Sequence, residues 1–591
     1  MASDTSSNTL TDVDSASQSR SKRPTHWQLV SSHTLLTPAV LNHKYNGSGT
    51  EEDPFRVEFI PNDPRDPMGF AMWKKWAITL LVAFATLAVA FVSSAYTGGV
   101  TQIIVGFHTS DEVVVLGVSL FVLGFAIGPL LWAPLSELYG RQVLFFATYG
   151  VLTAFNAGAA GAQNIQTLII LRFFAGAFGS SPLTNAGGVI ADMFPASQRG
   201  LAIAIFAAAP FMGPTLGPIV GGFLGETKGW RWVEGLMAIF TGALWIVGSL
   251  TIPETYAPVL LKNRAAAMCK KTGQVYKSRI ECDRGKQSLG QSFKTALSRP
   301  WVLLLKEPIV LLLSTYMAII YGTLYMMFAA FPIVYQQNRH WSEGIGGLPF
   351  LGVAVGMIGA VIYTIWDNKR YRGVEAAGIA KGETGAAPEA RLPPAMVGSV
   401  CIPVGLFIFA WTNYPSIHWI VSIIFTAPFG FGMVLVFLSI MNYLIDSYTI
   451  YAASVLAANS VLRSMFGAVF PLFTTYMYDK LGIHWATTIP AFLALACVPF
   501  PFLFYKYGPV IRKQCKFARE AAEVMAKLKQ REPVDDGIKD EKSDSGDSKQ
   551  KVAPTLEPEG VEAARSDVGG DESDRAARLQ DPERDVEKAQ E

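Results

Sequence analysis

The chain has 591 residues, of which 50% are hydrophobic and only 16% are charged. A soluble protein usually carries about 25% charged residues, and here the apolar residues come in blocks of about 20, enough for a helix to cross a ~30 Å hydrocarbon layer. This pattern predicts a polytopic, all-α integral membrane protein and excludes a porin-type barrel, whose strands alternate apolar and polar residues. The net charge of +2 provides no global field to attract nucleic acid.

Cysteine and histidine usage argues against a metal site. The five cysteines are odd in number, and neither they nor the seven histidines show metal-ligand or redox spacing. We therefore expect no disulfide framework, no metal and no cofactor. Because no catalytic constellation accompanies them, we also expect that the protein is not an enzyme. The N-terminus lacks the pattern of a cleaved signal peptide, so the first span is expected to direct its own insertion.

The apolar blocks predict twelve membrane spans. Their expected limits are 76–98, 112–133, 143–161, 167–190, 200–222, 234–252, 308–331, 347–366, 395–412, 417–441, 450–477 and 485–506. Eleven basic residues lie between the sixth and seventh spans, whereas the loops on the opposite side hold only Lys228, Arg231, Arg339 and Lys480. Cytoplasmic loops carry the excess of Lys and Arg, so both termini and the middle linker are predicted to be cytoplasmic.

The expected organisation is two six-helix bundles with a site between them. It comprises a disordered tail (1–75), a first bundle (76–252), a cytoplasmic linker (253–307), a second bundle (308–506) and a mostly disordered tail (507–591). The end of the chain is rich in charged and small residues and cannot offset the entropy of ordering. Residues 511–530 form either an amphipathic helix on the inner leaflet or a solvated segment.

The turn after the second span reads APLSELYGRQ (133–142). It resembles the loop motif G-x-L-A-D-R-x-G-R-R/K of the major facilitator superfamily. Gly140 allows a tight turn. The resemblance implies that Glu137 and Arg141 lock the two bundles together at the cytoplasmic face. We expect these residues to form an inner-gate network with Asp192 and Asp446, and a purely structural cluster of salt bridges is the alternative.

The fourth span contains LIILRFFAGAFGS (168–180), which resembles the family's R-x-x-Q-G motif. The resemblance implies that Arg172 takes part in proton coupling. An Arg within a span costs at least ~2.5 kcal/mol near the helix centre, so Arg172 should face a cavity or a partner. A structural Arg that snorkels outward or bonds backbone carbonyls is the alternative.

The fifth span reads GLAIAIFAAAPFMGPTLGPIVGG (200–222). Its spacing resembles the motif of drug:proton antiporters, with the matching positions Gly200, Gly213, Pro214 and Gly217. Glycine and proline together permit a kink, and small residues let a partner helix approach closely. The resemblance implies transport in the export direction, and generic packing of small residues is the alternative.

Further stretches narrow the resemblance to one branch. GWRWVEG (229–235), PETYAPVLL (253–261) and the segment 442–473 are similar to the twelve-span drug:proton antiporters of fungi. This resemblance implies a monomeric exporter of drugs, fungicides or secondary metabolites that binds a small-molecule substrate and protons within a lipid bilayer. It implies the plasma membrane as the location, with the vacuolar membrane as the alternative.

A proton antiporter needs a group that takes up and releases protons, and buried carboxylates usually serve. The sequence predicts no carboxylate near the middle of a span, because the acids, Glu234 among them, lie near predicted span ends. The only deep charges are expected to be Arg172 and Arg463. The group that carries the proton therefore stays open at this point: a rim carboxylate, another group, or no coupling at all.

The substrate cavity is expected to be aromatic and rich in methionine, which suits apolar or amphipathic molecules. The candidate lining residues are Tyr321, Tyr325, Asn442, Asn459 and Arg463. Tyr321 and Tyr325 share one helix face because they are four residues apart. Arg463 either pairs with an anionic group of the substrate or braces its helix. The leading hypothesis is proton-driven export by alternating access; the alternatives are a polyamine or nutrient transporter on the same fold and a non-transporting membrane sensor.

Overall fold

The computed structural model describes residues 25–195, 198–284, 289–381 and 386–531. Contacts divide the chain into two units, one that ends at Arg519 and one that begins at Glu520. The described residues of the second unit belong to the helix α21 (Lys516–Arg531), so residues 516–531 of the expected C-terminal tail are helical.

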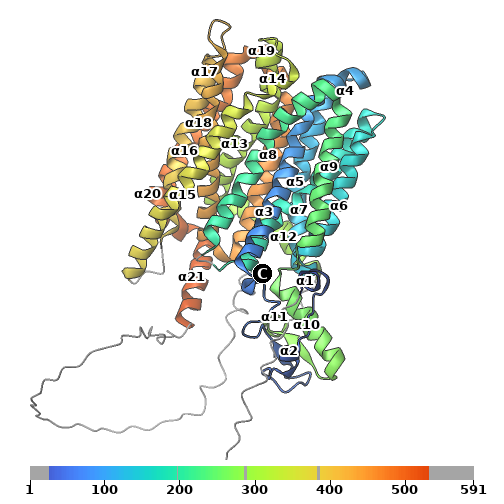
Figure 1. The fold of residues 1–591 in the computed structure, drawn as a ribbon. Coiled ribbons are helices and arrows are strands. Elements are labelled where there is room, and N and C mark those ends of the chain that lie inside the picture. Colours follow the sequence, from blue (N-terminus) through green and yellow to red (C-terminus); the bar gives the residue numbers. More distant parts are fainter. Residues whose placement is uncertain (1–24, 196–197, 285–288, 382–385, 532–591) are drawn as a thin grey trace, which may run out of the picture. The chain divides into compact units, whose positions relative to one another are not determined.

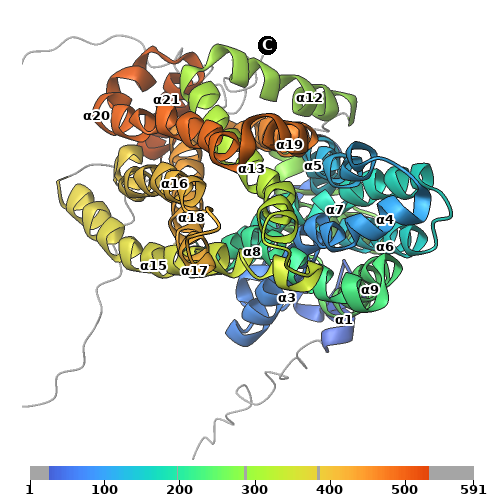
Figure 2. The ribbon, with the colours of Figure 1, turned by 90° about the horizontal axis from the view of Figure 1, so that it is seen from above.

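Long helices make up two bundles (Figure 1). The first contains α3 (Met72–Ala95), α4 (Val100–Phe107), α5 (Asp111–Tyr139), α6 (Arg141–Ala160), α7 (Ile165–Met193), α8 (Arg199–Lys228) and α9 (Trp230–Thr251). The second contains α13 (Pro308–Phe331), α14 (Glu343–Gly347), α15 (Phe350–Ala380), α16 (Pro393–Trp411), α17 (Trp419–Ile424), α18 (Thr426–Ser447), α19 (Ala452–Cys497) and α20 (Pro499–Gln514). Seen end-on, α8 of the first bundle and α13 and α19 of the second lie where the two bundles meet (Figure 2).

Eleven helical stretches in the described residues are long and apolar enough to cross a membrane. The last of them, Thr449–Gln514, has 66 residues and would be about 99 Å long as one helix, roughly three times the hydrocarbon thickness. Gly482 interrupts it with φ 72° and ψ 167°, a backbone conformation that favours glycine. Division at Gly482 gives two spans, so the prediction of twelve membrane helices is confirmed.

The prediction of a disordered N-terminal tail is wrong for residues 25–75. This segment forms α1 (His26–Ser31), α2 (Pro38–Asn42), the strand β1 (Phe55–Val57) and a 3-10 turn at Pro67–Gly69 before α3 begins. The linker is also folded, into α10 (Ala257–Thr272), the strand β2 (Tyr276–Ser278), α11 (Arg279–Arg284) and α12 (Leu289–Lys306). β1 and β2 pair in parallel with Phe55 opposite Tyr276, a small sheet within an otherwise helical described chain.

A buried ion pair joins the N-terminal segment to the linker. Asp63 accepts two hydrogen bonds from Arg264 of α10, at 2.5 and 3.1 Å, and each side chain is only 1% exposed. Arg65 donates to the Glu254 carbonyl at 3.1 Å. Burial lowers the pKa of Arg65 to about 10, which leaves the guanidinium charged at neutral pH. These hydrogen bonds offset part of the hydration free energy that the charged side chains lose when they are buried.

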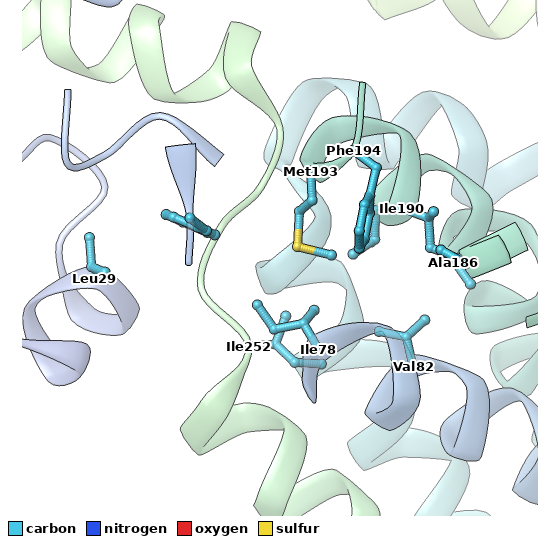
Figure 3. Close-up of a cluster of buried hydrophobic side chains, with 11 residues drawn as sticks. Leu29, Ile78, Val82, Ala186, Ile190, Met193, Phe194 and Ile252 are labelled. Carbon is cyan, nitrogen blue, oxygen red and sulfur yellow. The ribbon is translucent and has the colours of Figure 1, made fainter. Parts of the chain in front are cut away.

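Apolar packing completes the attachment of this segment. Val40 and Val57 pack with Met268 of α10 in one small cluster. Leu29 of α1 belongs to a second cluster that joins it to the first bundle (Figure 3). Other members of this second cluster are Ile78, Val82, Ile190, Met193 and Ile252. The polar composition of the segment concealed this fold, because only a few apolar side chains form the contacts.

The buried ion pair gives a test of this attachment. Removal of one partner leaves an uncompensated buried charge, so Asp63→Ala should destabilise the protein by about 3–5 kcal/mol. Glu58→Ala is the matched control, because Glu58 pairs with Arg279 at the surface and such a pair contributes only about 0–1 kcal/mol. Thermal unfolding of the purified protein measures both. Equal melting temperatures for the two variants would contradict the clamping role of Asp63.

Candidate functional site

A fully buried ion pair lies inside the first bundle. Arg172 of α7 is 0% exposed and its Nη1 lies 3.2 Å from Oε1 of Glu234 in α9, which is 1% exposed. The other guanidinium nitrogens donate to the carbonyls of Gly117 in α5 and Val92 in α3, at 2.9 and 3.1 Å. Arg172 therefore connects four helices through one side chain. Both of its expected roles, pairing with a partner and bonding carbonyls, are present together.

The position of Glu234 near the start of its span agrees with the expectation, but its side chain is buried within the protein and is not at a solvated rim. It is near the start of α9, but Trp230 and Met237 on the same helix face are also buried, at one turn before and after it. Its Oε2 has no hydrogen-bond partner in the described part of the chain. The periodicity of α9 is the signal that could have revealed its burial. The bundle thus contains a buried carboxylate near one end of α9, and its burial is what sequence reasoning missed.

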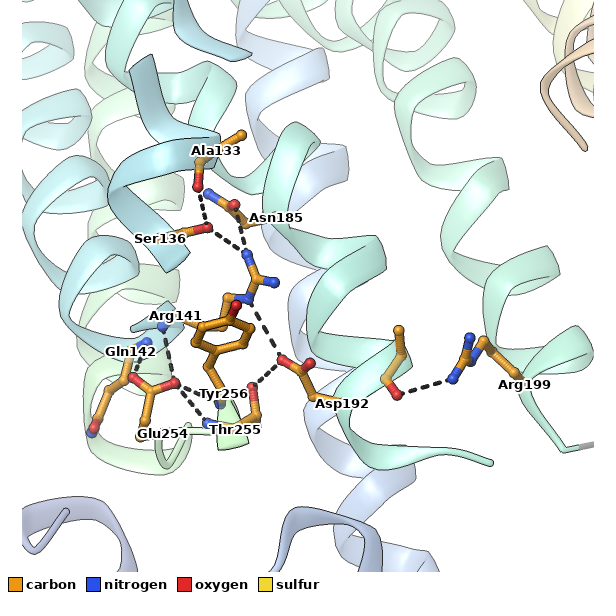
Figure 4. A network of polar contacts seen from close by, with 11 residues as sticks. Ala133, Ser136, Arg141, Gln142, Asn185, Asp192, Arg199, Glu254, Thr255 and Tyr256 are labelled. Carbon is orange, nitrogen blue, oxygen red and sulfur yellow. Dashed lines mark hydrogen bonds and ion pairs between the residues drawn. The ribbon is translucent and has the colours of Figure 1, made fainter. Parts of the chain in front are cut away.

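A second polar cluster surrounds Arg141 at the end of the bundles that carries α10 to α12, here called the linker end (Figures 1 and 4). Arg141 Nε lies 3.5 Å from Oδ2 of Asp192. Its Nη1 donates to Asn185 Oδ1 at 3.3 Å and to the Ser136 hydroxyl. Asp192 also accepts a hydrogen bond from Thr255 Oγ1 at 3.3 Å. The loop after α5 is therefore tied to α7 and to the linker.

Glu254 is the organising acid of this cluster, and sequence reasoning did not identify it. Its buried carboxylate accepts the backbone N–H groups of Arg141 and Gln142, at 3.0 and 3.1 Å, which are unpaired donors in the first turn of α6. It also accepts the N–H groups of Thr255 and Tyr256. Gly140 has φ 96°, and a Cβ there would collide with the Glu254 carboxylate. No local pattern indicates this contact.

The structure brings together Arg141 and Asp192 of the expected inner-gate network but not Asp446. Asp446 pairs instead with Arg391, at 2.9 Å between Oδ2 and Nε, within the second bundle. Glu137 is an exposed residue of α5. The prediction that Asp446 joins Arg141 and Asp192 is therefore wrong for this structure, because each bundle neutralises its own charges at the linker end.

The glycine pattern of α8 faces α3. A Cβ on Gly213 would lie 2.6 Å from the Leu87 carbonyl oxygen, and one on Gly217 would lie 2.7 Å from the Ala95 nitrogen. Backbone thus meets backbone, which only glycine permits. Pro214 lies between them in a helix that is assigned as continuous from Arg199 to Lys228. Gly200 is in the first turn of α8, and its surroundings lie outside what the structure describes.

A small apolar cavity lies between the bundles, and its side chains pack so closely that it has essentially no room for a water molecule. Its lining residues are Phe211 of α8, Met317, Ile320 and Tyr321 of α13, and Met433 and Phe437 of α18. The rings of Phe211 and Phe437 meet edge to face across the bundles, 4.8 Å apart. Sites for drug-sized molecules are about 300–1,000 Å³, so the cavity must widen to admit one.

Among the five predicted cavity residues, Tyr321 lines the cavity and the others lie nearby or apart. The Tyr325 hydroxyl forms one hydrogen bond with the Ser93 hydroxyl, at 2.8 Å, and accepts one from the Tyr321 hydroxyl, at 3.4 Å. The guanidinium of Arg463 stacks over Tyr321 at 4.8 Å. Asn459 donates a hydrogen bond to the Met441 sulfur. Asn442, which follows Met441 in α18, is half-buried.

Besides the bond between Ser93 and Tyr325, three hydrogen bonds that join the two bundles lie at the end away from the linker, here called the far end. In the described residues, Glu226 accepts the Gly344 N–H at 2.8 Å, and Asp111 accepts the Thr475 hydroxyl at 2.9 Å. Gln102 donates to Glu343 at 3.4 Å. At the linker end, α12 packs against both α5 and α19 and so bridges the bundles (Figure 2). The two ends are therefore connected in different ways.

The model of the Major Facilitator Superfamily matches residues 82–471. The chain belongs to this superfamily. It is 67% identical over 506 residues to the MFS-type efflux pump MFS2 of Trichophyton rubrum, a match that covers 85% of this chain and 84% of that one. It is 65% identical over 511 residues to the major facilitator superfamily multidrug transporter mdrA of Aspergillus fumigatus, covering 86% and 84%.

Another relative and one solved structure agree with this membership. The chain is 57% identical over 494 residues to the efflux pump FUB11 of Gibberella moniliformis, covering 84% of this chain and 83% of that one. The proton:xylose symporter XylE has the same fold, with a TM-score of 0.53 at 15% identity over 74% of this chain and 96% of that one. The major facilitator fold and the multi-pass membrane character of this chain are therefore established.

The contact between α8 and α3 gives a test. Gly217→Ala places a methyl group against the Ser94 hydroxyl and the Ala95 backbone, and overpacking of this kind costs about 1–3 kcal/mol. We expect a lower melting temperature and less folded protein in the membrane. Gly187→Ala is the control, since a Cβ at this helical position meets nothing within 4 Å. If both variants melt like the wild type, the close approach at Gly217 is not required.

Proposed function

We propose that this protein is a secondary active exporter of hydrophobic and amphipathic small molecules, driven by proton antiport without a further cofactor. The observation that carries the proposal is the cavity between the bundles, whose six lining residues are apolar, aromatic or sulfur-containing. Such side chains adapt to varied apolar surfaces. Phe211 comes from the first bundle and the other lining residues from the second, so relative movement of the bundles changes the cavity.

Alternating access would act on the two ends in turn. The hydrogen bonds that Glu226 and Asp111 accept from the second bundle join the bundles at the far end, which supports a state that is shut on that side. The basic residues of the linker support a cytoplasmic location of the linker end under the positive-inside rule. A substrate would enter from this end and leave after the far-end bonds break. The plasma membrane is the proposed location, and the vacuolar membrane is the alternative.

The pair of Arg172 and Glu234 is the proposed proton-coupling element. Protonation of Glu234 would remove the anionic partner of Arg172 and leave a buried guanidinium with carbonyl acceptors alone, an unfavourable state that favours rearrangement. One of these acceptors is Val92, and the next residue, Ser93, bonds Tyr325 of the second bundle. Tyr325 in turn contacts Tyr321, which lines the cavity. This series of contacts supports a link between protonation and the substrate cavity.

A polyamine or nutrient transporter on the same fold is the alternative. The six residues that line the cavity include no carboxylate, and the cationic Arg463 lies against two of them. A polycation would gain no ion pair there and would be repelled by Arg463. Apolar and amphipathic molecules therefore fit this cavity better.

Efflux of the neutral fluorophore Nile red from yeast that lack their own pumps tests this function. We expect the wild type to lower accumulation, and a protonophore to abolish the effect. Arg172→Ala and Glu234→Gln should raise accumulation to the level of cells without the transporter. Glu112→Gln should behave as the wild type, because Glu112 is an exposed acid at the start of α5.

A second readout separates coupling from folding. Glu234→Gln should still exchange substrate across the membrane without a proton gradient, since only the proton-binding group is lost. Loss of exchange together with normal surface expression would contradict a coupling role for Glu234. Unchanged accumulation in cells that express the wild type at the surface would overturn export itself.

A further inference from the structure

Arg463 of α19 lies beside the cavity without an anionic partner. Its guanidinium stacks over Tyr321 at 4.8 Å and over Phe437 at 4.9 Å, and both rings line the cavity. Its Nε is buried without a hydrogen-bond acceptor. Within the described residues Arg463 forms no ion pair, in contrast to Arg172, which has a carboxylate and two carbonyls. A half-buried positive charge with an unpaired Nε in the described part of the chain therefore lies next to two of the cavity's aromatic rings.

The aromatic stacking compensates this charge only in part. Stacking on the two rings is favourable but does not replace the hydrogen-bond acceptors that a charged Arg within a membrane span loses when it leaves water. Stacking also leaves the planar N–H donors of the guanidinium free to meet an acceptor, and a carboxylate matches their geometry. A ligand that brings one carboxylate would complete the site.

Neighbouring polar groups are suited to the same ligand. The hydroxyls of Tyr321 and Tyr325 lie 3.4 Å apart on the cavity side of α13, and a hydroxyl can donate to a carboxylate. Asn459 is four residues before Arg463 and so shares its helix face. Its amide nitrogen donates only to the sulfur of Met441, which is a weak acceptor. Groups that can donate hydrogen bonds thus lie on α19, which carries Arg463, and on α13, which carries one of its two aromatic contacts, and the six lining residues are otherwise apolar.

We infer that Arg463 binds the carboxylate of amphipathic monocarboxylic acids whose apolar body occupies the cavity. This inference rests on the proposed export function and specifies its substrate class. A dianion such as a phosphate monoester would need further cations, and the six lining residues supply none. A neutral analogue of the same shape keeps the apolar contacts but lacks the ion pair, so it should bind more weakly.

Ligand binding to the purified full-length protein tests the inference. The probes are 1-naphthoate and its neutral isostere 1-naphthamide, and the rise in melting temperature with ligand concentration gives each affinity. We expect Arg463→Met to weaken naphthoate binding at least tenfold while it changes naphthamide binding less than twofold. Arg463→Lys should restore part of the naphthoate affinity. Arg231→Met is the matched control, since Arg231 stacks on Trp230 away from the cavity.

The outcomes distinguish this inference from the export proposal. Naphthoate binding that is unaffected in Arg463→Met, or an equal loss for both probes in a variant that melts like the wild type without ligand, would overturn the inference. Export of Nile red by the same wild-type protein would then still stand. Naphthoate binding that depends on Arg463 in a protein that moves neither probe in proteoliposomes would support the binding site and contradict export.

Discussion

The structure of the first bundle depends on the compensation of one buried cation. Arg172 has no access to water, and its donors are satisfied by Glu234 and by the carbonyls of Gly117 and Val92. Each acceptor comes from a different helix, so the positions of α3, α5, α7 and α9 are coupled through a single guanidinium. In a low-dielectric interior such a pair is strong while it is intact and costly when one partner changes its charge. This dependence makes the pair suitable for energy coupling as well as for stability.

Sequence reasoning succeeded where the determining property is local. Block length and hydropathy predicted the twelve spans, and the spacing of Gly213 and Gly217 indicated a close helix contact, because small residues act at the point where they occur. It failed where distant segments meet. Glu254 lies 113 residues after Arg141, and Arg264 lies 201 residues after Asp63. These contacts depend on how the linker folds back onto the bundle, and no periodicity or composition encodes that path.

The two deep arginines show the same limit within the site. Both Arg172 and Arg463 interrupt an apolar span, so their sequence environments predicted the same need for a partner. The structure gives them opposite situations: Arg172 meets a carboxylate of its own bundle, whereas Arg463 meets two aromatic rings beside the cavity. Glu234 was assigned to a rim because acids near a helix end usually reach water. Glu234 lies on the buried face of α9, together with Trp230 and Met237. The face of the helix on which it lies therefore determines its environment, and its distance from the helix end does not.

The two ends of the bundles are held together by different kinds of contact. At the linker end, the pair of Arg141 and Asp192 belongs to the first bundle and the pair of Arg391 and Asp446 to the second. The bundles can therefore separate there without breaking either ion pair, while α12 keeps them connected. At the far end, separation must break direct bonds such as that between Glu226 and Gly344. Opening at the far end thus breaks direct hydrogen bonds between the bundles, and the coupling proposed for Glu234 would have to supply that free energy. The contacts between the bundles at Tyr325 are the proposed route.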